Sequence, residues 1–343
     1  MEGKRSIGED GGPVYHGGDL VAARQRFPHA REPWIDLSTG INARPYPLPV
    51  LSDDSWTRLP ARADILELEV AAAQFFGTAD PAMVTACPGT QAILQWLPHV
   101  VPARSVGILG FTYQEHGHVW RAAGAKEVRV VERWQDLAEF DVAVVVNPNN
   151  PDGRFVRPED LTALAAAMAE RGGTLVVDEA FMDLLDASCS LVPRLPDNAI
   201  VLRSFGKTWG LAGLRLGFAV AGAECTARFR AAMGPWAVSG PAVEIGRRAY
   251  ADRDWLQATR AQLAADAARL DALLAGAGFE IVGGTTLYRL ARHDQAGAWF
   301  ERLAAAGILT RPFPAKPCWL RFGLPAAGTD WARLARALTV DAA

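Results

Sequence analysis

One lysine of this chain lies in a setting that suits covalent chemistry with an aldehyde. Lys207 belongs to the small-residue segment 204–217, which opens with Ser204 and carries Arg215 eight positions after the lysine. A glycine-rich turn lets a flat ring lie against the backbone, so the lysine amine can condense with an aldehyde carbon. The hydroxyl of Ser204 and the fork of donors on Arg215 suit a phosphate group. Taken alone, the segment could also be an ordinary loop whose glycines only permit close packing.

A carboxylate at the end of a predicted strand complements this lysine. Residues 174–177 have the pattern of a buried strand and lead directly into Asp178. In a doubly wound sheet, ligands bind outside the carboxyl ends of the strands. A carboxylate there can pair with a pyridine nitrogen and keep it protonated, so that the ring accepts electrons from a carbanion. The two residues together favour pyridoxal 5'-phosphate as the cofactor, although Asp178 could instead only cap the following turn.

Two further segments add donors to this site. The predicted strand 142–146 runs into a loop rich in Asn and Pro, where Asn150 could donate to the phenolic oxygen of the cofactor. Gly89, Thr90 and Gln91 open an apolar helical stretch whose free backbone N–H groups and hydroxyl suit a phosphate. Any capped helix resembles this last signal. Along the chain, the phosphate loop at Gly89 comes first, then the Asn150 loop, then Asp178 at a strand end, and last the Lys207 loop. The four elements in this order nevertheless predict one site.

This series of motifs resembles the fold-type I pyridoxal phosphate enzymes related to histidinol-phosphate aminotransferase, over nearly the whole length. The resemblance implies that Lys207 is the catalytic Schiff-base lysine, with Asp178 at the pyridine nitrogen. It also implies that Tyr113 stacks on the cofactor face. Without the family, Tyr113 could equally be a core tyrosine with a satisfied hydroxyl. The cofactor-binding residues implied are Gly89, Thr90, Gln91, Tyr113, Asn150, Asp178, Ser204, Lys207 and Arg215.

Within this group, segments 16–20 and 35–42 resemble the threonine-phosphate decarboxylases of cobalamin biosynthesis, and Phe181 stands where aminotransferases usually carry a tyrosine. The resemblance implies decarboxylation of L-threonine O-3-phosphate to (R)-1-amino-2-propanol O-2-phosphate. A histidinol-phosphate or related class I/II aminotransferase is the alternative. The two reactions differ in which bond at Cα stands perpendicular to the ring, and a sequence does not show that geometry. Arg321 would grip the α-carboxylate. The substrate-binding residues implied are His16, Asn42, Asn150 and Arg321.

The resemblance also implies a homodimer with active sites at the subunit interface. Two positions depart from the aminotransferase pattern. Leu59 occupies the place of a tyrosine that would reach the phosphate of the partner's cofactor, and Gly206 replaces a serine of the lysine loop. Either fewer donors hold the phosphate in this chain, or another group compensates.

Composition agrees with an ordinary globular enzyme. Half of the residues are hydrophobic and the net charge is -3, which gives no reason to expect nucleic acid or an anionic membrane as partner. Four widely separated cysteines without a CxxC pair predict a reducing cytoplasm. No apolar run approaches the ~20 residues that span a bilayer. A metal is not expected, because Glu115, His116 and His118 would supply too few ligands from one turn.

Alternating strand and helix signals predict an α/β protein with the fold-type I architecture, a large domain with a mostly parallel sheet and a smaller α+β domain. Asp64 is predicted to cap a helix that stops before Gly77, and a long helix is expected over 254–277. The predicted division is an N-terminal segment 1–49 that joins the small domain, a cofactor-binding domain 50–235 and a small domain 236–343.

Overall fold

The computed structural model describes residues 17–78 and 80–339. The chain forms two compact units, of which the larger contains Pro45–Asn150 and Arg154–Ala258 and the smaller Met1–Arg44, Pro151–Gly153 and Thr259–Ala343. The last changeover, between Ala258 and Thr259, falls inside α10 (Arg253–Gly276), the long helix that the sequence predicts over 254–277. The division at residues 49 and 235 stays a prediction.

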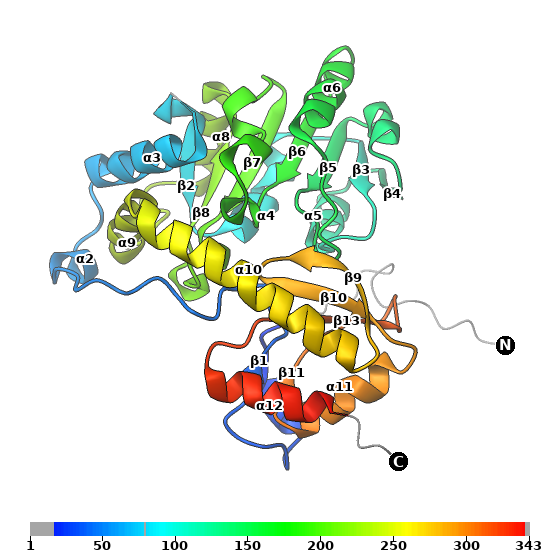
Figure 1. Ribbon diagram of the computed structural model, residues 1–343. Coiled ribbons are helices and arrows are strands. Elements are labelled where there is room, and N and C mark those ends of the chain that lie inside the picture. Colours follow the sequence, from blue (N-terminus) through cyan, green and yellow to red (C-terminus); the bar gives the residue numbers. More distant parts are fainter. Residues whose placement is uncertain (1–16, 79, 340–343) are drawn as a thin grey trace. The chain divides into compact units, whose positions relative to one another are not determined.

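A seven-stranded sheet lies at the centre of the larger unit (Figure 1) and confirms the predicted α/β architecture. The strand order is β2-β8-β7-β6-β5-β3-β4, in which β8 runs antiparallel to both of its neighbours while β7, β6, β5, β3 and β4 pair in parallel. The strands are β2 (Val84–Cys87), β3 (Ser105–Leu109), β4 (Glu127–Val131), β5 (Val142–Val146), β6 (Thr174–Asp178), β7 (Ala199–Ser204) and β8 (Gly217–Val220).

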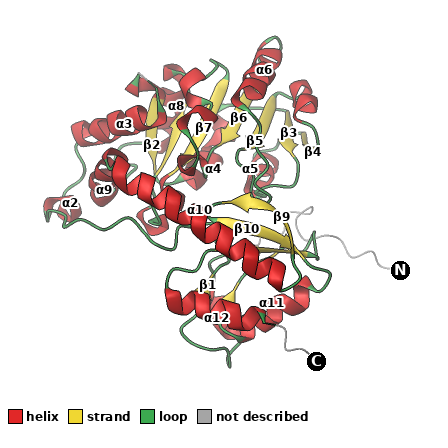
Figure 2. Ribbon diagram, in the orientation of Figure 1, coloured by secondary structure: helices red, strands yellow, loops and turns green. Residues whose placement is uncertain are grey.

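Helices pack against both faces of this sheet (Figure 2), and its central strands β5 and β6 accordingly carry runs of buried apolar residues. Helices α3, α6 and α9 share one core with Phe76 and Tyr250, and α4, α5 and α8 share another with Ile93 and Trp120. The helices of this unit are α2 (Asp54–Thr57), α3 (Arg62–Phe76), α4 (Thr90–Val100), α5 (Glu115–Ala122), α6 (Pro158–Ala169), α7 (Phe205–Thr208), α8 (Ala223–Met233) and α9 (Gly240–Ala251). No helix in the described part of the chain is long and apolar enough to cross a membrane.

The helix that Asp64 is predicted to cap begins two residues earlier. α3 starts at Arg62, and Asp64 in its first turn accepts a hydrogen bond from the Ala61 backbone N–H at 3.0 Å. The carboxylate therefore reaches back to the residue before the helix instead of occupying the cap position itself. The helix ends at Phe76, before Gly77 as predicted, and the left-handed φ of 85° at Gly77 explains why a glycine stands there.

The smaller unit contains an antiparallel sheet of order β12-β13-β10-β9 and a parallel pair, β1-β11. The elements are α1 (Leu20–Arg26), β1 (Ile35–Asp36), β9 (Glu280–Thr285), β10 (Tyr288–Arg292), α11 (Ala296–Ala305), β11 (Ile308–Leu309), β12 (Arg311–Pro312), β13 (Trp319–Gly323) and α12 (Gly328–Leu338).

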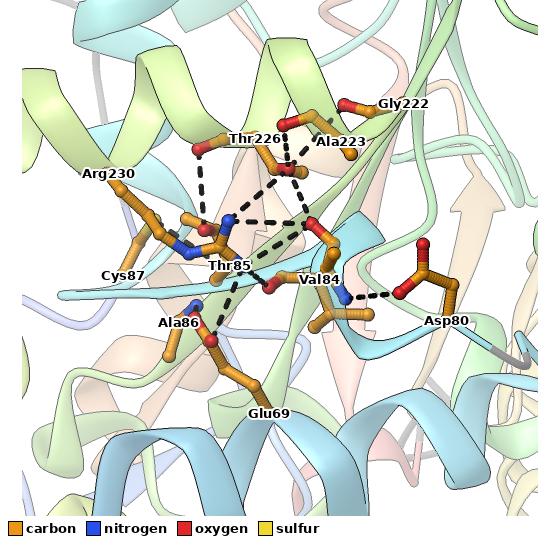
Figure 3. Close-up of polar contacts among 11 residues, drawn as sticks. Glu69, Asp80, Val84, Thr85, Ala86, Cys87, Gly222, Ala223, Thr226 and Arg230 are labelled. Atoms are coloured by element: carbon orange, nitrogen blue, oxygen red, sulfur yellow. Dashed lines mark hydrogen bonds and ion pairs between the residues drawn. The ribbon is translucent and has the colours of Figure 1, made fainter. Parts of the chain in front are cut away.

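Side chains from two helices bind the open edge of β2, the outermost strand of the large sheet (Figure 3). Glu69 of α3 accepts a hydrogen bond from the Ala86 N–H at 3.0 Å. Arg230 of α8 donates to the Val84 carbonyl and lies 3.4 Å from the Glu69 carboxylate. These bonds replace those that another strand would make. They also fix the strand that leads into Gly89.

Candidate active site

The cofactor residues predicted in the larger unit gather at one edge of its sheet. Gly89 follows β2, and Arg215 precedes the antiparallel β8, which starts from the same edge. Because the carboxyl ends of parallel strands share an edge, the loops after β3, β5, β6 and β7 lie there too. These ends and loops carry Tyr113, Asn150, Asp178, Ser204 and Lys207.

Lys207 lies in the single turn α7, directly after β7, and is half-buried. The turn rests on buried aromatic rings, because Phe205 and Trp209 stack with centroids 5.5 Å apart and planes 13° from parallel. Gly206 packs against Ala212 so closely that a Cβ would lie 2.7 Å from the Ala212 Cα. Packing therefore accounts for the glycine that replaces a serine in this loop.

Gly89, Thr90 and Arg215 form a corner suited to an anion. α4 begins at Thr90, after Gly89 with a left-handed φ of 84°. A Cβ on Gly89 would lie 2.7 Å from Arg215 Nη2, and a Cβ on Gly217 would lie 2.7 Å from the Thr90 nitrogen. Ser204 is the register partner of Gly217 across β7 and β8. Helix N–H groups, a guanidinium and hydroxyls thus lie close together, a donor set that fits a phosphate.

The two carboxylate oxygens of the buried Asp178 have different partners. Oδ2 lies 2.9 Å from Nε2 of His116, and Oδ1 accepts the Ala180 N–H at 3.1 Å. Asp178 therefore caps the following turn with one oxygen while the other is held by a histidine. His116 is fully buried, and its Nδ1 has no hydrogen-bond partner among the described residues. These two contacts hold the carboxylate in one orientation.

Tyr113 is joined to this pair and to the phosphate corner. Its hydroxyl donates to Gln91 Oε1 at 3.2 Å, and Gln91 Nε2 donates to Glu115 at 2.8 Å. The ring stands edge-on to His116, with centroids 6.1 Å apart. The satisfied hydroxyl and the half-buried ring agree with both interpretations of Tyr113, so cofactor stacking stays a prediction.

The loop after β5 is held by its other asparagines. Asn147 exchanges two hydrogen bonds with the Val156 backbone, each 2.9 Å, and its own N–H donates to the Asp178 carbonyl at 2.8 Å. Asn149 donates to a carbonyl of the loop after β3 at 3.0 Å. These bonds place the half-buried Asn150 just beyond the end of β5. Its contact with the ring oxygen stays a prediction.

The smaller unit contains two of the predicted substrate residues, Asn42 and Arg321, while His16 lies outside the described residues. Asn42 is buried, and its Oδ1 accepts a backbone N–H two residues further on at 3.0 Å. Arg321 on β13 is buried as well. Its Nη2 donates to the Ser38 carbonyl at 2.7 Å, and its guanidinium lies 4.9 Å from the centroid of the Tyr288 ring.

A second arginine, which the sequence analysis does not select, faces Arg321. Arg311 on β12 is the register partner of Arg321 on β13. Burial, together with the charge of Arg311, lowers the pKa of Arg321 to about 9. Like charges opposite each other on neighbouring strands are destabilising, and an anion between them removes that cost. The strand register reveals this pair, whereas the sequence shows only two separate arginines.

His116 is the other residue whose place the sequence analysis misses. Glu115 bonds Gln91 and His116 lies against Asp178, and no group of three metal-ligating side chains occurs within residues 17–78 and 80–339. Tyr113 lies in the loop before α5 and His116 in the first turn of that helix, so no helical spacing in the sequence links the two.

A lysine turn, a buried carboxylate and an anion corner at one edge of a doubly wound sheet define the fold-type I class of pyridoxal phosphate enzymes. The chain belongs to the class I and II aminotransferase family, which it matches over residues 27–339.

Two relatives match over almost the whole chain. A threonine-phosphate decarboxylase from a Sinorhizobium species is 44% identical over 329 residues, 95% of this chain and 98% of the relative. One from Pseudomonas aeruginosa is 42% identical, covering 94% and 96%. Histidinol-phosphate aminotransferase 1 from Cupriavidus pinatubonensis is 33% identical, covering 69% of each chain.

Solved structures share the fold at lower identity. Histidinol-phosphate aminotransferase from Sinorhizobium meliloti, solved in complex with pyridoxal-5'-phosphate, superposes with a TM-score of 0.81 at 22% identity, covering 95% of this chain and 94% of that one. L-threonine-O-3-phosphate decarboxylase from Porphyromonas gingivalis gives 0.72 at 19% identity, covering 88% and 97%.

Proposed function

We propose that this protein is a pyridoxal phosphate-dependent lyase that decarboxylates L-threonine O-3-phosphate to (R)-1-amino-2-propanol O-2-phosphate. The observation that carries the proposal is the identity of 44% and 42%, over nearly the full length, to relatives named threonine-phosphate decarboxylase. The aminotransferase relatives match less of the chain at lower identity. Phe181, where aminotransferases usually carry a tyrosine, is buried and also favours the lyase.

The described residues of the larger unit fit the cofactor. When bound, pyridoxal phosphate supplies an aldehyde that joins an amine and a protonated ring that withdraws electrons from Cα. The amine of Lys207 would hold the aldehyde, and the Gly89–Thr90 helix start, Ser204 and Arg215 would bind the phosphate. Tyr113 and Asn150 would contact the ring face and the ring oxygen.

Asp178 and His116 would keep the ring nitrogen protonated. The buried Asp178 carboxylate is held in one orientation by its contacts with His116 and the Ala180 N–H. A negative charge at that position holds the proton on a pyridine nitrogen. The Lys207 amine would return a proton to Cα after the carboxylate has left as carbon dioxide.

The arginines of the smaller unit suit a substrate with two anionic groups. Arg321 would bind the α-carboxylate through its planar fork of donors. Arg311, its register partner, would face the phosphate of the same substrate or lie between the two anions. An amino acid phosphate offers enough negative charge to offset both guanidiniums, whereas a neutral side chain would leave the second one facing a like charge.

We also infer a homodimer. Large apolar side chains, including Leu48, Trp56, Leu59 and Trp236, are more than half exposed, and together they line a groove of about 760 Å³ in the larger unit. Exposed apolar patches of this kind mark interaction surfaces. Sedimentation of the holoenzyme should give twice the mass of one chain, and a monomer at micromolar concentration would contradict the dimer. A cytoplasmic location and a role in cobalamin biosynthesis also stay predictions.

The direct test is to give the cofactor-loaded protein L-threonine O-3-phosphate and to measure carbon dioxide and aminopropanol phosphate. Release of both in equal amounts supports the lyase. Amino transfer from histidinol phosphate to 2-oxoglutarate, without carbon dioxide from threonine phosphate, would establish the aminotransferase instead.

Lys207→Ala tests the covalent role. Loss of the proton transfer alone should lower kcat about 10²–10⁴-fold. Borohydride reduction should attach the cofactor to the wild-type chain but not to the variant, as intact-mass spectrometry reports. Lys207→Arg is the matched control, because it keeps a positive charge without an amine that condenses at neutral pH. Normal turnover by Lys207→Ala would disprove the mechanism.

A further inference from the structure

Ser38 joins Arg321 to the beginning of the described chain. The Ser38 carbonyl accepts the Arg321 Nη2 donor at 2.7 Å. Its hydroxyl donates to Asp36 Oδ1 at 2.5 Å and accepts the Gly18 N–H at 2.7 Å, and its own N–H donates to the same Asp36 oxygen at 2.8 Å. The residue is only 1% exposed. Its carbonyl, hydroxyl and N–H are therefore all fixed by hydrogen bonds.

Two glycines, Gly17 and Gly323, bring the backbones of their own segments directly against segment 37–39, which contains Ser38. A Cβ on Gly17 would overlap with the Ser38 carbonyl oxygen, and a Cβ on Gly323 would lie 2.7 Å from the Thr39 carbonyl oxygen. The Gly323 N–H donates to the Leu37 carbonyl at 2.7 Å. Segment 37–39 is thus held between the N-terminal backbone and the end of β13, the strand that carries Arg321.

Two neighbouring groups, the Ser38 carbonyl and the Tyr288 ring, set the orientation of the Arg321 guanidinium. The Ser38 carbonyl holds one end of the guanidinium, and the Tyr288 ring lies 4.9 Å from its centre. Burial and Arg311 lower the pKa of Arg321, and the negative charge of Asp36 raises it, because that charge favours the protonated guanidinium. A guanidinium binds a carboxylate through two parallel N–H bonds, so its plane must be set before the ligand arrives.

We propose that Asp36 and Ser38 are positioning residues for the substrate carboxylate: Asp36 fixes Ser38, whose carbonyl holds Arg321 in its binding orientation, and the Gly17–Gly18 backbone locks the arrangement. This inference rests on the proposed function, which makes Arg321 the carboxylate-binding residue. Neither Asp36 nor Ser38 needs to touch the substrate.

The prediction is selectivity between two ligands that differ by one group. Aminopropanol phosphate retains the amine and phosphate of threonine phosphate but has no carboxylate. In full-length holoenzyme, Asp36→Ala and Ser38→Ala should each raise the KM for threonine phosphate about three- to tenfold, the range of one ordinary hydrogen bond. The kcat and the inhibition constant of aminopropanol phosphate should stay at their wild-type values.

Two further variants keep the test decisive. Asp36→Asn retains an oxygen that can accept both Ser38 bonds, so it should recover most of the loss. Gly17→Ala displaces the backbone next to the Ser38 carbonyl without removing any side chain, and it should give the same selective rise in KM even if Asp36→Ala folds poorly.

Equal weakening of both ligands would assign Asp36 and Ser38 a general structural role and overturn the proposal. Unchanged KM in Ser38→Ala and Gly17→Ala would overturn it as well. Failure of the proposed function has a different result, since wild-type holoenzyme would then release no carbon dioxide from threonine phosphate.

Discussion

Asp178 and Glu179 are neighbours in the chain, yet they belong to opposite faces of the large sheet. The alternation along β6 puts Val176 in the core shared with α4 and Val177 in the core shared with α3. Asp178 accordingly meets His116 on the first side. Glu179 meets the fully buried Arg203 on the other.

The two carboxylates differ in the kind of partner they have. Arg203 donates to Glu179 at 2.9 Å and also bonds Asp183, while the Ser190 hydroxyl donates to Glu179 at 2.7 Å. Burial raises the pKa of Glu179, and Arg203 opposes that effect. Arg203 is a guanidinium that bonds two carboxylates, whereas Asp178 has one imidazole and one backbone N–H as partners. We expect the Arg203 network to stabilise the strand ends and the Asp178–His116 pair to serve the proposed chemistry.

The largest effect should come from breaking the network behind the site. Arg203→Met removes the cation that bonds Glu179 and Asp183 and leaves two buried carboxylates, so the free energy of unfolding should fall by about 3–5 kcal/mol. Urea denaturation of the wild type and the variant measures this difference in unfolding free energy. The triple variant Arg203→Met, Glu179→Leu, Asp183→Leu should lose less than the single one, because no unpaired charge remains. A greater loss in the triple variant would mean that the charges themselves stabilise the fold.

Asp178→Asn should give the opposite pattern, with chemistry lost and the fold retained. Removing a preorganised charge from a site costs about 10²–10³-fold in kcat. The asparagine keeps an oxygen that can accept the Ala180 N–H, so the unfolding free energy should change much less than in Arg203→Met. Steady-state kinetics with saturating cofactor and urea denaturation of the same sample compare the two. If Asp178→Asn unfolds as readily as Arg203→Met, the division of roles between the faces is wrong.

His116→Asn should have a smaller effect on the same side of the sheet. A hydrogen bond to a charged group contributes about 1.5–3 kcal/mol, so kcat/KM should fall about 10- to 100-fold. His118→Asn, two residues away on the same helix, is the matched control and should behave as wild type. Kinetics of the two variants, measured side by side from pH 6 to 9, decide the point. Equal losses in both would indicate a role for α5 and none for the Asp178 contact.

Much of this arrangement can be predicted from the sequence because the residues directly follow strands. Asp178 and Asn150 each follow an apolar run, and parallel strands bring such ends to one edge without any further information. The predicted strands 142–146 and 174–177 are confirmed as β5 and β6 for a related reason, since burial on both faces of the sheet gives each an apolar run.

The partners that depend on register or on long-range packing could not be predicted. Arg311 and Arg321 face each other through the pairing of β12 with β13, and nothing in either short segment fixes that register. Asp36 and Ser38 have common residue types, and their role depends on Gly17 and on β13, which are distant in the chain. The predicted cap position of Asp64 was wrong by three residues, because a carboxylate inside the first turn can also bond the backbone of the cap residue, here Ala61.

The smallest effect concerns the edge of β2, where the comparison can be sharpened at a site that holds a strand without taking part in chemistry. Glu69→Ala leaves the Ala86 N–H without its acceptor and should lower the unfolding free energy toward the lower end of about 1–3 kcal/mol. The cost is low because a cavity of about 490 Å³ beside Glu69 and Ala86 has room for water. Glu69→Gln keeps the acceptor and is the control.

Comparing the wild type with Glu69→Gln also tests a pH dependence of the unfolding free energy whose sign is known. Burial raises the pKa of Glu69 above 4.5, against the lowering by the Ala86 N–H and Arg230. The folded state therefore binds more protons than the unfolded state above pH 4.5, and this group's contribution to stability falls as pH rises through that window. Glu69→Gln has no such titration. The stability of the wild type relative to Glu69→Gln should thus decrease from pH 4.5 upward, and an increase would mean that Arg230 outweighs burial at this edge.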